Sequence, residues 1–508
     1  MTDLAALIEG VMAVEPDAPA VEWEGRWLDW RGLASRIAAV RAVLDRLELP
    51  QGARVGIMLR NRLPQLQALY AVVLRGDCLV TVNPTYPDAV VAADIAGLDL
   101  AVVIAELADL ERPGMEEALS RTGTAVIALP GAWEGEPLLR HSREPGAARC
   151  PATPATMIEM LTSGTTGTPK RVALTRRAFR ESFEATLHYE HRSGDTAPVL
   201  RSGVQILVAP LTHIGGIWSA LNSVAGGRRI VLLEKFAVAP WHRAVATYRP
   251  AVAGATAAGL RMILDADLPR KDLASLRALI AGTAAVDPAT IDTFLDRYGI
   301  PVLTNYGATE FAGPVAGWSL LDFKAHWGDR RGSVGRLHAG VEARVVDAAS
   351  GAVLPPMADG VLELRSTQLP DPDRWFRTTD LARLAEDGFL WITGRADAAI
   401  IRGGFKVHPA ELVSALEAHP DVREAVVVGL PDARLGAVPV AAVMLRAGVS
   451  APADSELDAF LRARLLPYQL PVFVAVVDDV PRTGSMKPIL PDVAMLIERL
   501  RTQGDSSC

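Results

Sequence analysis

The sequence predicts an α/β protein with two successive series of parallel strands, then a small antiparallel β unit and a compact α+β tail. Three observations support this class. From about residue 50, short continuous apolar runs alternate with longer helical stretches, which is typical of parallel sheets covered on both faces. A second such series begins near residue 204. From about residue 330, short strands joined by tight turns replace the helices.

The first α/β series contains four expected strands, in "ARVGIML", "CLVTVNP", "LAVVIAE" and "TAVIALP". A helix is expected in "LPQLQALYAVVLRG", and a further helical segment between the last two strands. The stretch "REPGAARCPATPAT" is rich in Pro and Gly and separates this series from the next part of the chain. The second series has strands in "VQILVAP", "RRIVLLE", "PAVAGAT", "LRALIAGT" and "PVLTNYG", with a helix over 288–298.

The antiparallel unit is expected in "VEARVVD", "GVLELRS" and "DLARLAEDGFLWITGR", where the dipeptide Asp387-Gly388 favours a hairpin turn. The tail combines helices near 409–418 and 454–466 with strands in "REAVVVG", "VPVAAVML" and "VFVAVVD". These segments indicate a separate α+β unit at the end of the chain.

Composition excludes several function classes. The 508 residues suggest roughly three domains or subdomains, and the net charge of −7 argues against nucleic-acid and anionic-membrane partners. The three cysteines, Cys78, Cys150 and Cys508, lack the spacing of a disulfide framework or a zinc site. No basic export signal opens the chain, and no apolar run reaches the ~18 residues of a membrane helix. We expect a soluble, cytoplasmic protein.

One loop carries an unusual set of residues. "LTSGTTGTPKRV" (161–172) lies between the apolar runs "MIEML" and "RVALT", so it joins two strands. Its glycines let backbone amides approach an anion closely, its hydroxyls add neutral donors, and its lysine adds charge. The common pattern GxxxxGK[ST] is absent. The residues expected to surround phosphate are Thr162, Ser163, Gly164, Thr165, Thr166, Gly167 and Lys170.

"TSGTTGTPK" resembles the phosphate loop of the adenylate-forming superfamily of acyl- and aryl-CoA synthetases, peptide-synthetase adenylation domains and firefly-type luciferases. Other motifs of that family occur in order over almost the full length. The resemblance implies an N-terminal domain, residues 1–396, of two doubly wound sheets plus a small β-barrel-like subdomain. It also implies a mobile α+β C-terminal domain, residues 397–508.

Two motifs extend the resemblance to the nucleotide. "NYGATE" (305–310) is similar to the family's Tyr-Gly-x-Thr-Glu, which implies that Tyr306 stacks on adenine, Thr309 contacts the α-phosphate and Glu310 holds Mg²⁺. "FRTTD" (376–380) resembles the segment whose Asp, here Asp380, binds the ribose hydroxyls; Thr379 stands where the family usually has Gly. The further residues expected at ATP are Gly282, Thr283, Ala284, Asn305, Gly307 and Arg395.

Two more motifs concern domain motion and catalysis. "ITGRADAAIIRGGFKVHPAEL" (392–412) resembles the hinge region, with Asp397 as the pivot and Ala398 at a commonly acidic position. "PRTGSMKP" (481–488) resembles the loop that delivers the adenylation lysine, here Lys487, with Met486 in place of the usual Gly. The small residues Gly403 and Gly404 would line the thiol channel.

The acid pocket is expected along "APLTHIGGIW", "GATAAGL", "AGTAAV" and "GATEFAG". Its small residues suggest room for an aromatic or medium-sized apolar acid, and His213 would lie near the carboxylate. No Asp is present in the first segment to bind an α-ammonium, so a free amino acid is not expected. The pocket residues are His213, Ile214, Gly215, Thr256, Gly282, Gly307, Ala308 and Gly313.

The family reaction has two steps. A carboxylate attacks the α-phosphate of ATP to give an acyl-adenylate and pyrophosphate, and a nucleophile, commonly the CoA thiol, then displaces AMP. We expect ATP, Mg²⁺ and CoA. The family often has Trp where this chain has Leu435, and its Tyr-Lys-x-Pro appears here with Gln469. Transfer to a carrier-protein thiol, an amine or another nucleophile therefore stays open, as does a nucleotide-binding scaffold without turnover. Nothing in the sequence points to light emission.

Overall fold

The computed structural model describes residues 3–141, 153–162, 170–189, 197–282, 284–402, 405–432, 434–483 and 486–505. The chain divides into two compact units. The described residues up to Glu342, together with Arg365–Arg374, form the first unit. Ala343–Leu364 and the described residues from Trp375 onward form the second.

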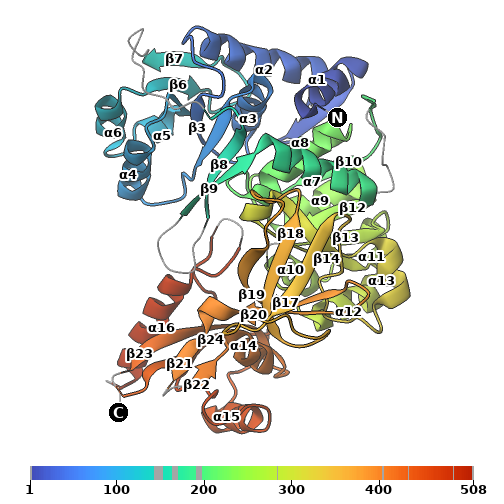
Figure 1. Ribbon diagram of the computed structural model, residues 1–508, viewed down its shortest axis with the longest axis vertical. Coiled ribbons are helices and arrows are strands. Elements are labelled where there is room, and N and C mark those ends of the chain that lie inside the picture. Colours follow the sequence, from blue (N-terminus) through green and yellow to red (C-terminus); the bar gives the residue numbers. More distant parts are fainter. Residues whose placement is uncertain are drawn as a thin grey trace. The chain divides into compact units, whose positions relative to one another are not determined.

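A seven-stranded sheet forms the first part of the first unit, in the order β7-β6-β5-β3-β4-β8-β9 (Figure 1). Its inner strands are parallel, while β7 and β9 add antiparallel edges. The strands are β3 (Arg54–Met58), β4 (Cys78–Val82), β5 (Val102–Glu106), β6 (Ala125–Leu129), β7 (Leu138–His141), β8 (Thr156–Thr162) and β9 (Lys170–Thr175).

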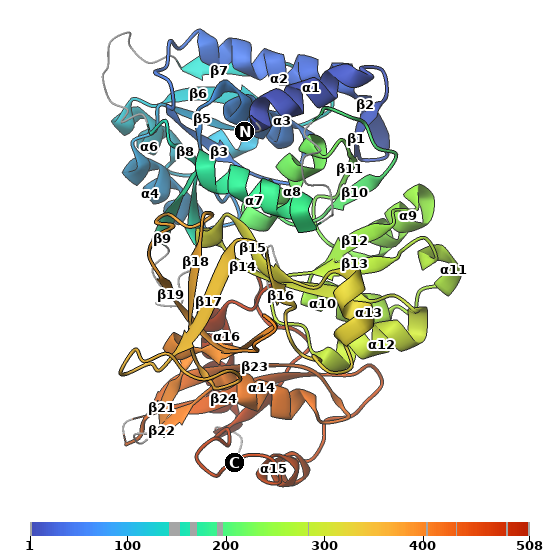
Figure 2. The same cartoon turned by 45° about the vertical axis from the view of Figure 1, so that its right-hand side comes forward.

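Helices cover both faces of this sheet, as its continuous apolar strands predict. One face packs on a cluster with α4 and α6, and the other on a larger cluster with α1, α2, α3, α7 and α8 (Figure 2). The helices are α1 (Leu4–Val14), α2 (Trp30–Asp45), α3 (Leu63–Arg75), α4 (Asp88–Leu98), α5 (Leu107–Leu110), α6 (Met115–Thr122), α7 (Arg176–Tyr189) and α8 (Ile214–Ala225).

A four-stranded sheet in the order β10-β11-β1-β2 brings the start of the chain beside a segment about 200 residues further on. It contains β1 (Pro19–Trp23), β2 (Arg26–Asp29), β10 (Val204–Leu207) and β11 (Arg229–Leu232). Val21 of β1 pairs in parallel with Ile230 of β11. The sequence pattern placed β10 and β11 in one series with the later strands, so their separate sheet is a new finding.

A third sheet completes the first unit, in the order β12-β13-β14-β15-β16. The first three strands are parallel, and β15 and β16 add antiparallel pairs. The elements are α9 (Val238–Tyr248), β12 (Val252–Ala255), α10 (Ala257–Asp265), α11 (Arg270–Leu273), β13 (Ala278–Ala281), α12 (Pro288–Tyr298), β14 (Val302–Ala308), the 3₁₀ turn η1 (Thr309–Phe311), β15 (Gly313–Gly317), α13 (Leu320–His326) and β16 (Arg336–Leu337).

The second unit contains two sheets. One has the order β17-β18-β19-β20, and the other has the order β22-β21-β24-β23 with β25 beside β24. The elements are β17 (Val341–Val346), β18 (Gly360–Ser366), β19 (Phe376–Leu384), β20 (Leu390–Arg395), η2 (Ala396–Ala398), β21 (Ile400–Arg402), β22 (Phe405–Val407), α14 (Pro409–Glu417), β23 (Val422–Asp432), β24 (Gly436–Leu445), α15 (Asp454–Arg462), β25 (Val474–Val476) and α16 (Leu490–Asp505).

The α/β class is confirmed, and every strand expected from an apolar run is present. Two details differ from expectation. Helix α15 ends at Arg462 and not near 466, and the antiparallel sheet β17–β20 groups with the C-terminal segment. A functional boundary at residue 397 stays a prediction. Among the helices that the structure describes, none has the length and apolar character to cross a membrane.

Candidate functional site

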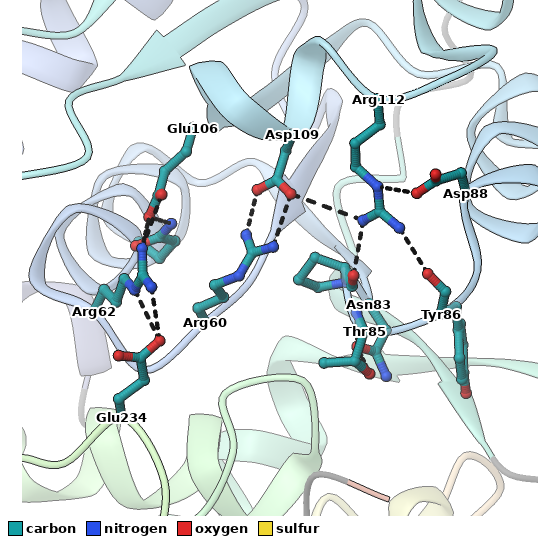
Figure 3. A network of polar contacts seen from close by, with 12 residues as sticks. Arg60, Arg62, Asn83, Thr85, Tyr86, Asp88, Glu106, Asp109, Arg112 and Glu234 are labelled. Atoms are coloured by element: carbon teal, nitrogen blue, oxygen red, sulfur yellow. Dashed lines mark hydrogen bonds and ion pairs between the residues drawn. The ribbon is translucent and has the colours of Figure 1, made fainter.

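Polar side chains at the carboxyl end of β3 form a network that the sequence pattern did not reveal (Figure 3). Strand β3 lies between β4 and β5, so the strand order of the sheet reverses at β3. Open α/β sheets commonly bind ligands at such a point, beyond the carboxyl ends of the strands. Here Arg60 pairs with buried Asp109. Arg62 lies 3.0 Å from Glu106 and 2.8 Å from Glu234. These charged groups pair with one another. Because Arg62 follows β3 and Glu234 follows β11, the network connects the sheets that contain these two strands.

Asn61, between those two arginines, holds the segment that leads to His213. It is 3% exposed. Its amide nitrogen donates to the carbonyls of Ala209 at 3.0 Å and Leu233 at 3.2 Å. Its amide oxygen accepts from the Leu211 N–H at 2.8 Å. Both ends of the amide are thus used, and the position of a short polar side chain after an apolar strand was the only signal in the sequence.

His213 immediately precedes helix α8. Its backbone N–H donates to the Pro210 carbonyl at 2.9 Å, and its carbonyl accepts from Gly216 at 3.0 Å. The start of the helix is tight: a Cβ atom added at Gly216 would lie 2.1 Å from the Pro210 oxygen. His213 and Ile214 are half-buried. The turn therefore fixes the backbone of the predicted carboxylate-end residue.

The predicted pocket glycines differ in what surrounds them. A Cβ added at Gly313 would lie 2.1 Å from Ser182 Oγ, and one at Gly307 would lie 2.7 Å from the Gly313 oxygen. At Gly282 it would lie 2.4 Å from Asn305 Oδ1. These three glycines permit close packing and leave no spare volume. Gly215 has no described atom within 4 Å of such a Cβ, so it borders open space.

Other predicted pocket and nucleotide residues cluster at the ends of β13, β14 and β15. Asn305 of β14 pairs with Gly317 of β15, and its amide lies against Gly282 after β13. The centroid of the Tyr306 ring lies 6.1 Å from that of the buried Phe311 ring. Thr256 has a structural role as the N-cap of α10, because its hydroxyl accepts from the Gly259 N–H at 3.0 Å. Three predicted residues at these strand ends, Ala284, Gly307 and Ala308, are at least partly exposed.

Thr309 and Glu310 form the turn η1 between β14 and β15. The turn closes through the Ala312 N–H, which donates to the Thr309 carbonyl at 3.1 Å. Glu310 is half-buried, and the described residues contain no cluster of three metal-binding side chains. A single carboxylate fits Mg²⁺, which keeps several waters and is commonly held by one or two carboxylates together with substrate phosphates.

The phosphate loop itself lies outside the described residues from Ser163 to Pro169, as does Thr283. Its two flanks are described. Strands β8 and β9 are antiparallel, and Thr162 pairs directly with Lys170, which is exposed. The prediction that the loop joins two strands is therefore confirmed, because the chain reverses between these residues.

In the second unit, Asp380 and Arg395 are directly paired residues of the neighbouring strands β19 and β20. Arg395 Nη1 lies 3.7 Å from Asp380 Oδ1. The Arg395 guanidinium also donates to the Thr379 hydroxyl. Thr379, which stands where the family usually has Gly, therefore gives Arg395 an additional hydrogen-bond partner. Asp380 keeps its position opposite Arg395.

Lys487 lies in the same unit, within reach of both charges. Lys487 is exposed as a residue, but surrounding protein atoms desolvate its ammonium and lower its pKa. Arg395 lowers this pKa further, and Asp380 raises it. Gly403 and Gly404 lie outside the described residues, and the backbone of Asp397 is in the turn η2.

Comparisons with known proteins agree with this arrangement. The model of a family described as AMP-binding enzyme matches residues 8–369, and that of the AMP-binding enzyme C-terminal domain matches residues 411–487. The chain is 30% identical to the fatty acid–[acyl-carrier-protein] ligase ScoC of Streptomyces coeruleorubidus, over 93% of this chain and 92% of that protein. It is 25% identical to a long-chain-fatty-acid–CoA ligase of Bacillus subtilis, over 95% and 92%.

Among solved structures, the chain resembles the amide bond synthetase McbA from Marinactinospora thermotolerans. The TM-score is 0.78 at 27% identity, and the match covers 97% of this chain and all of that one. The three relatives have different acceptors by name, a carrier protein, CoA and an amide-forming partner.

Proposed function

We propose, from the premise that this chain belongs to the AMP-binding enzyme family of adenylate-forming ligases, that it activates a carboxylic acid with ATP and Mg²⁺ and transfers the acyl group to the CoA thiol. The first product would be an acyl-adenylate, with release of pyrophosphate. The acid would be aromatic or medium-sized and apolar. We place the enzyme in the cytoplasm.

The observation that carries this proposal is the grouping of Asp380, Arg395 and Lys487 in one unit. A carboxylate that can accept from both hydroxyls of a ribose lies opposite a guanidinium, and both charges act on a lysine ammonium. This combination suits a nucleotide, because its ribose presents a vicinal diol and its phosphates present negative charge.

The chemistry of the first step explains which residues are needed. The substrate carboxylate approaches a polyphosphate, so charge neutralisation and alignment are the main requirements, and no protein nucleophile is needed. Lys487 and the loop around Lys170 would supply positive charge, and Glu310 would hold Mg²⁺, which would neutralise phosphate charge. Thr309 would contact the α-phosphate, Tyr306 would face the adenine, and His213 would lie near the carboxylate.

The second step needs a different arrangement, because the thiol must reach the carbonyl that the first step has activated. We propose rotation of the C-terminal part about Asp397, which would withdraw Lys487 and open a channel past Gly403 and Gly404. Such gating by conformational change is common in enzymes with sequential steps.

The pocket glycines support an acid of limited size. Gly215 borders open space, whereas Gly313 is backed by Ser182 and by Trp218, whose indole N–H donates to the Ser182 hydroxyl at 3.0 Å. We propose that the acid lies beside Gly215.

A second acceptor class rests on a specific contact. Gln469 replaces a family lysine that could meet CoA phosphates, and its amide donates to Glu411. A lysine at this position would attract the phosphates of free CoA, whereas here the nearby charge is the negative Glu411 carboxylate. A carrier-protein thiol is the alternative acceptor, and the name of the relative at 30% identity agrees with it.

Pyrophosphate release tests the proposal. Mg-ATP is supplied with a panel of benzoic, cinnamic, cyclic and fatty acids, each with CoA, with a pantetheinylated carrier protein, or with neither. We expect acid-dependent release that becomes steady turnover with CoA and yields an acyl-CoA mass. Turnover with the carrier protein alone would select the second acceptor. ATP binding without release for every acid would contradict the proposed activity.

A further inference from the structure

The segment that carries Lys487 is a short hairpin. Arg482 and Pro488 form an antiparallel bridge at its base. Inside it, the Thr483 N–H donates to the Lys487 carbonyl at 2.8 Å, and the Met486 N–H donates to the Thr483 carbonyl at 2.8 Å. The Thr483 hydroxyl accepts from the Lys487 N–H at 3.2 Å. The backbone of Lys487 is thus fixed relative to Thr483.

Met486 adopts the left-handed conformation, with φ of +65°. Hairpins of this length commonly place a left-handed residue just before the returning strand, usually glycine, because other residues are strained there. The family's glycine at this position therefore has a backbone reason, and this chain keeps the conformation without it.

Arg482, at the base of the hairpin, contacts the Met486 backbone. Its side chain is 8% exposed. Nη1 donates to the Met486 carbonyl at 3.1 Å. Nη1 and Nη2 contact the two carboxylate oxygens of Glu424 on β23 at 3.1 and 2.9 Å, and Nε contacts Asp479 at 3.0 Å. A buried, bidentate guanidinium has one orientation, so the Met486 carbonyl is tied to a strand of the sheet.

We propose that Arg482, anchored by Glu424, is a positioning residue for the first half-reaction. It holds the peptide that joins Met486 to Lys487 and so sets where the Lys487 ammonium lies. This inference rests on the proposed function of Lys487. A lysine on a four-carbon stem reaches a phosphate reproducibly only if its backbone is fixed, and small misplacements of a catalytic charge slow a reaction strongly.

The variants are chosen so that the protein still folds. Arg482→Met alone would leave Glu424 buried without its partner, whereas Arg482→Met with Glu424→Met removes both charges, a change that buried ion pairs often tolerate. Arg482→Lys keeps the charge but cannot bridge Glu424 and the Met486 carbonyl in the same way. Val440→Ala is the matched control, because Val440 is fully buried in the apolar cluster behind β23 and is not among the polar contacts of the hairpin.

Two rates are measured for each variant, with octanoate or cinnamate, whichever the unsubstituted protein uses. One is pyrophosphate release, and the other is acyl transfer from preformed acyl-adenylate to the thiol. We expect the double variant to slow pyrophosphate release by about tenfold or more, and to leave acyl transfer within about twofold. The rate of pyrophosphate release of Arg482→Lys should lie between those of the double variant and the unsubstituted protein. Val440→Ala should lower Tm and change the two rates together, if at all.

Amide hydrogen exchange of residues 481–489 provides a readout that needs no substrate, and we expect faster exchange in the double variant than in Val440→Ala. Unchanged pyrophosphate release in the double variant, or equal slowing of both half-reactions, would overturn the role of Arg482. If the unsubstituted protein releases no pyrophosphate with any acid of the panel described above, the proposed function fails separately. Amide hydrogen exchange then still tests whether Arg482 holds the hairpin. Unchanged exchange of residues 481–489 in the double variant would show that Arg482 does not hold it.

Discussion

Asp380 and Arg395 face one another across β19 and β20, with 3.7 Å between Asp380 Oδ1 and Arg395 Nη1, and they act in opposite directions on Lys487. Loss of solvent is the main cause that lowers the pKa of the Lys487 ammonium; the Arg395 guanidinium lowers it further, and the Asp380 carboxylate raises it. The net direction is downward. Desolvation and this pair together set the pH range in which Lys487 carries its charge.

The first prediction concerns pH. Only protonated Lys487 can neutralise phosphate, so adenylation should decline as pH rises through its pKa, and a lowered pKa moves that decline to lower pH. Arg395→Gln removes a positive neighbour and should move the decline to higher pH. Asp380→Asn removes a negative one and should move it to lower pH. The readout is pyrophosphate release at saturating ATP against pH, and an identical alkaline limb in all three proteins would contradict the assignment.

The second prediction concerns acid size. Gly215→Val places a side chain in open space, so the fold should persist while release with larger acids falls by about tenfold, roughly the discrimination that pocket methylenes give. Gly313→Ala is the contrast, because its Cβ would meet Ser182 Oγ and Trp218 Nε1. That overpacking should lower stability by about 1–3 kcal/mol, measured by denaturant unfolding. Unaltered acid preference in Gly215→Val would remove Gly215 from the pocket.

The third prediction concerns the left-handed residue of the lysine hairpin. Met486→Gly should leave the free energy of unfolding within about 0.5 kcal/mol, because relief of strain offsets the added freedom of the unfolded chain. Met486→Ile should lower it by more than about 1 kcal/mol, since β-branched residues are rarely tolerated at positive φ. Chemical denaturation compares the two variants. Equal stability of the glycine and isoleucine variants would mean that the turn does not have this conformation.

The fourth prediction concerns a half-buried histidine, His338. Desolvation lowers the pKa of His338 to about 4, opposed by its hydrogen bond to the Pro314 backbone. Between pH 6.5 and about 4 the unfolded chain binds a proton at this residue that the folded protein excludes. Stability contributed by His338 is therefore present above pH 6.5 and is lost as pH falls through that range, by up to about 3 kcal/mol.

His338→Gln should flatten this part of the curve of unfolding free energy against pH, measured by urea denaturation. A slope unchanged in His338→Gln would show that acidic residues alone cause the acid sensitivity.

Local pattern was enough to predict the strands formed by continuous apolar runs and several of the helices, but it did not predict strands β1, β2, β7, β15 and β16. The run at β3 and the helix over 288–298 depend on continuous or periodic apolar residues, which are neighbours in sequence. The pairing of Val21 with Ile230 could not be predicted, because a strand's partner across some 200 residues depends on how whole sheets pack. For the same reason, the sheet β10-β11-β1-β2 could not be predicted from the sequence.

The candidate site divides in the same way. Asp380, Arg395 and Lys487 could be named because a family pattern marks them, and the structure places all three in one unit. Asn61 and Arg482 were missed, because each acts through backbone groups that sequence does not reveal. Asn61 bonds residues about 150 positions away, and Arg482 bonds the carbonyl of a residue in an uncommon conformation.

The most direct test of the role of Lys487 is the Lys487→Ala variant, assayed separately for the two half-reactions with the acid that the unsubstituted enzyme prefers. We expect acid-dependent pyrophosphate release to fall by about 100-fold or more, because the variant loses a charge that acts in the transition state. Acyl transfer from preformed acyl-adenylate should stay close to that of the unsubstituted protein. Pyrophosphate release at the unsubstituted rate, or loss of acyl transfer with intact release, would contradict the assignment of Lys487 to the first step.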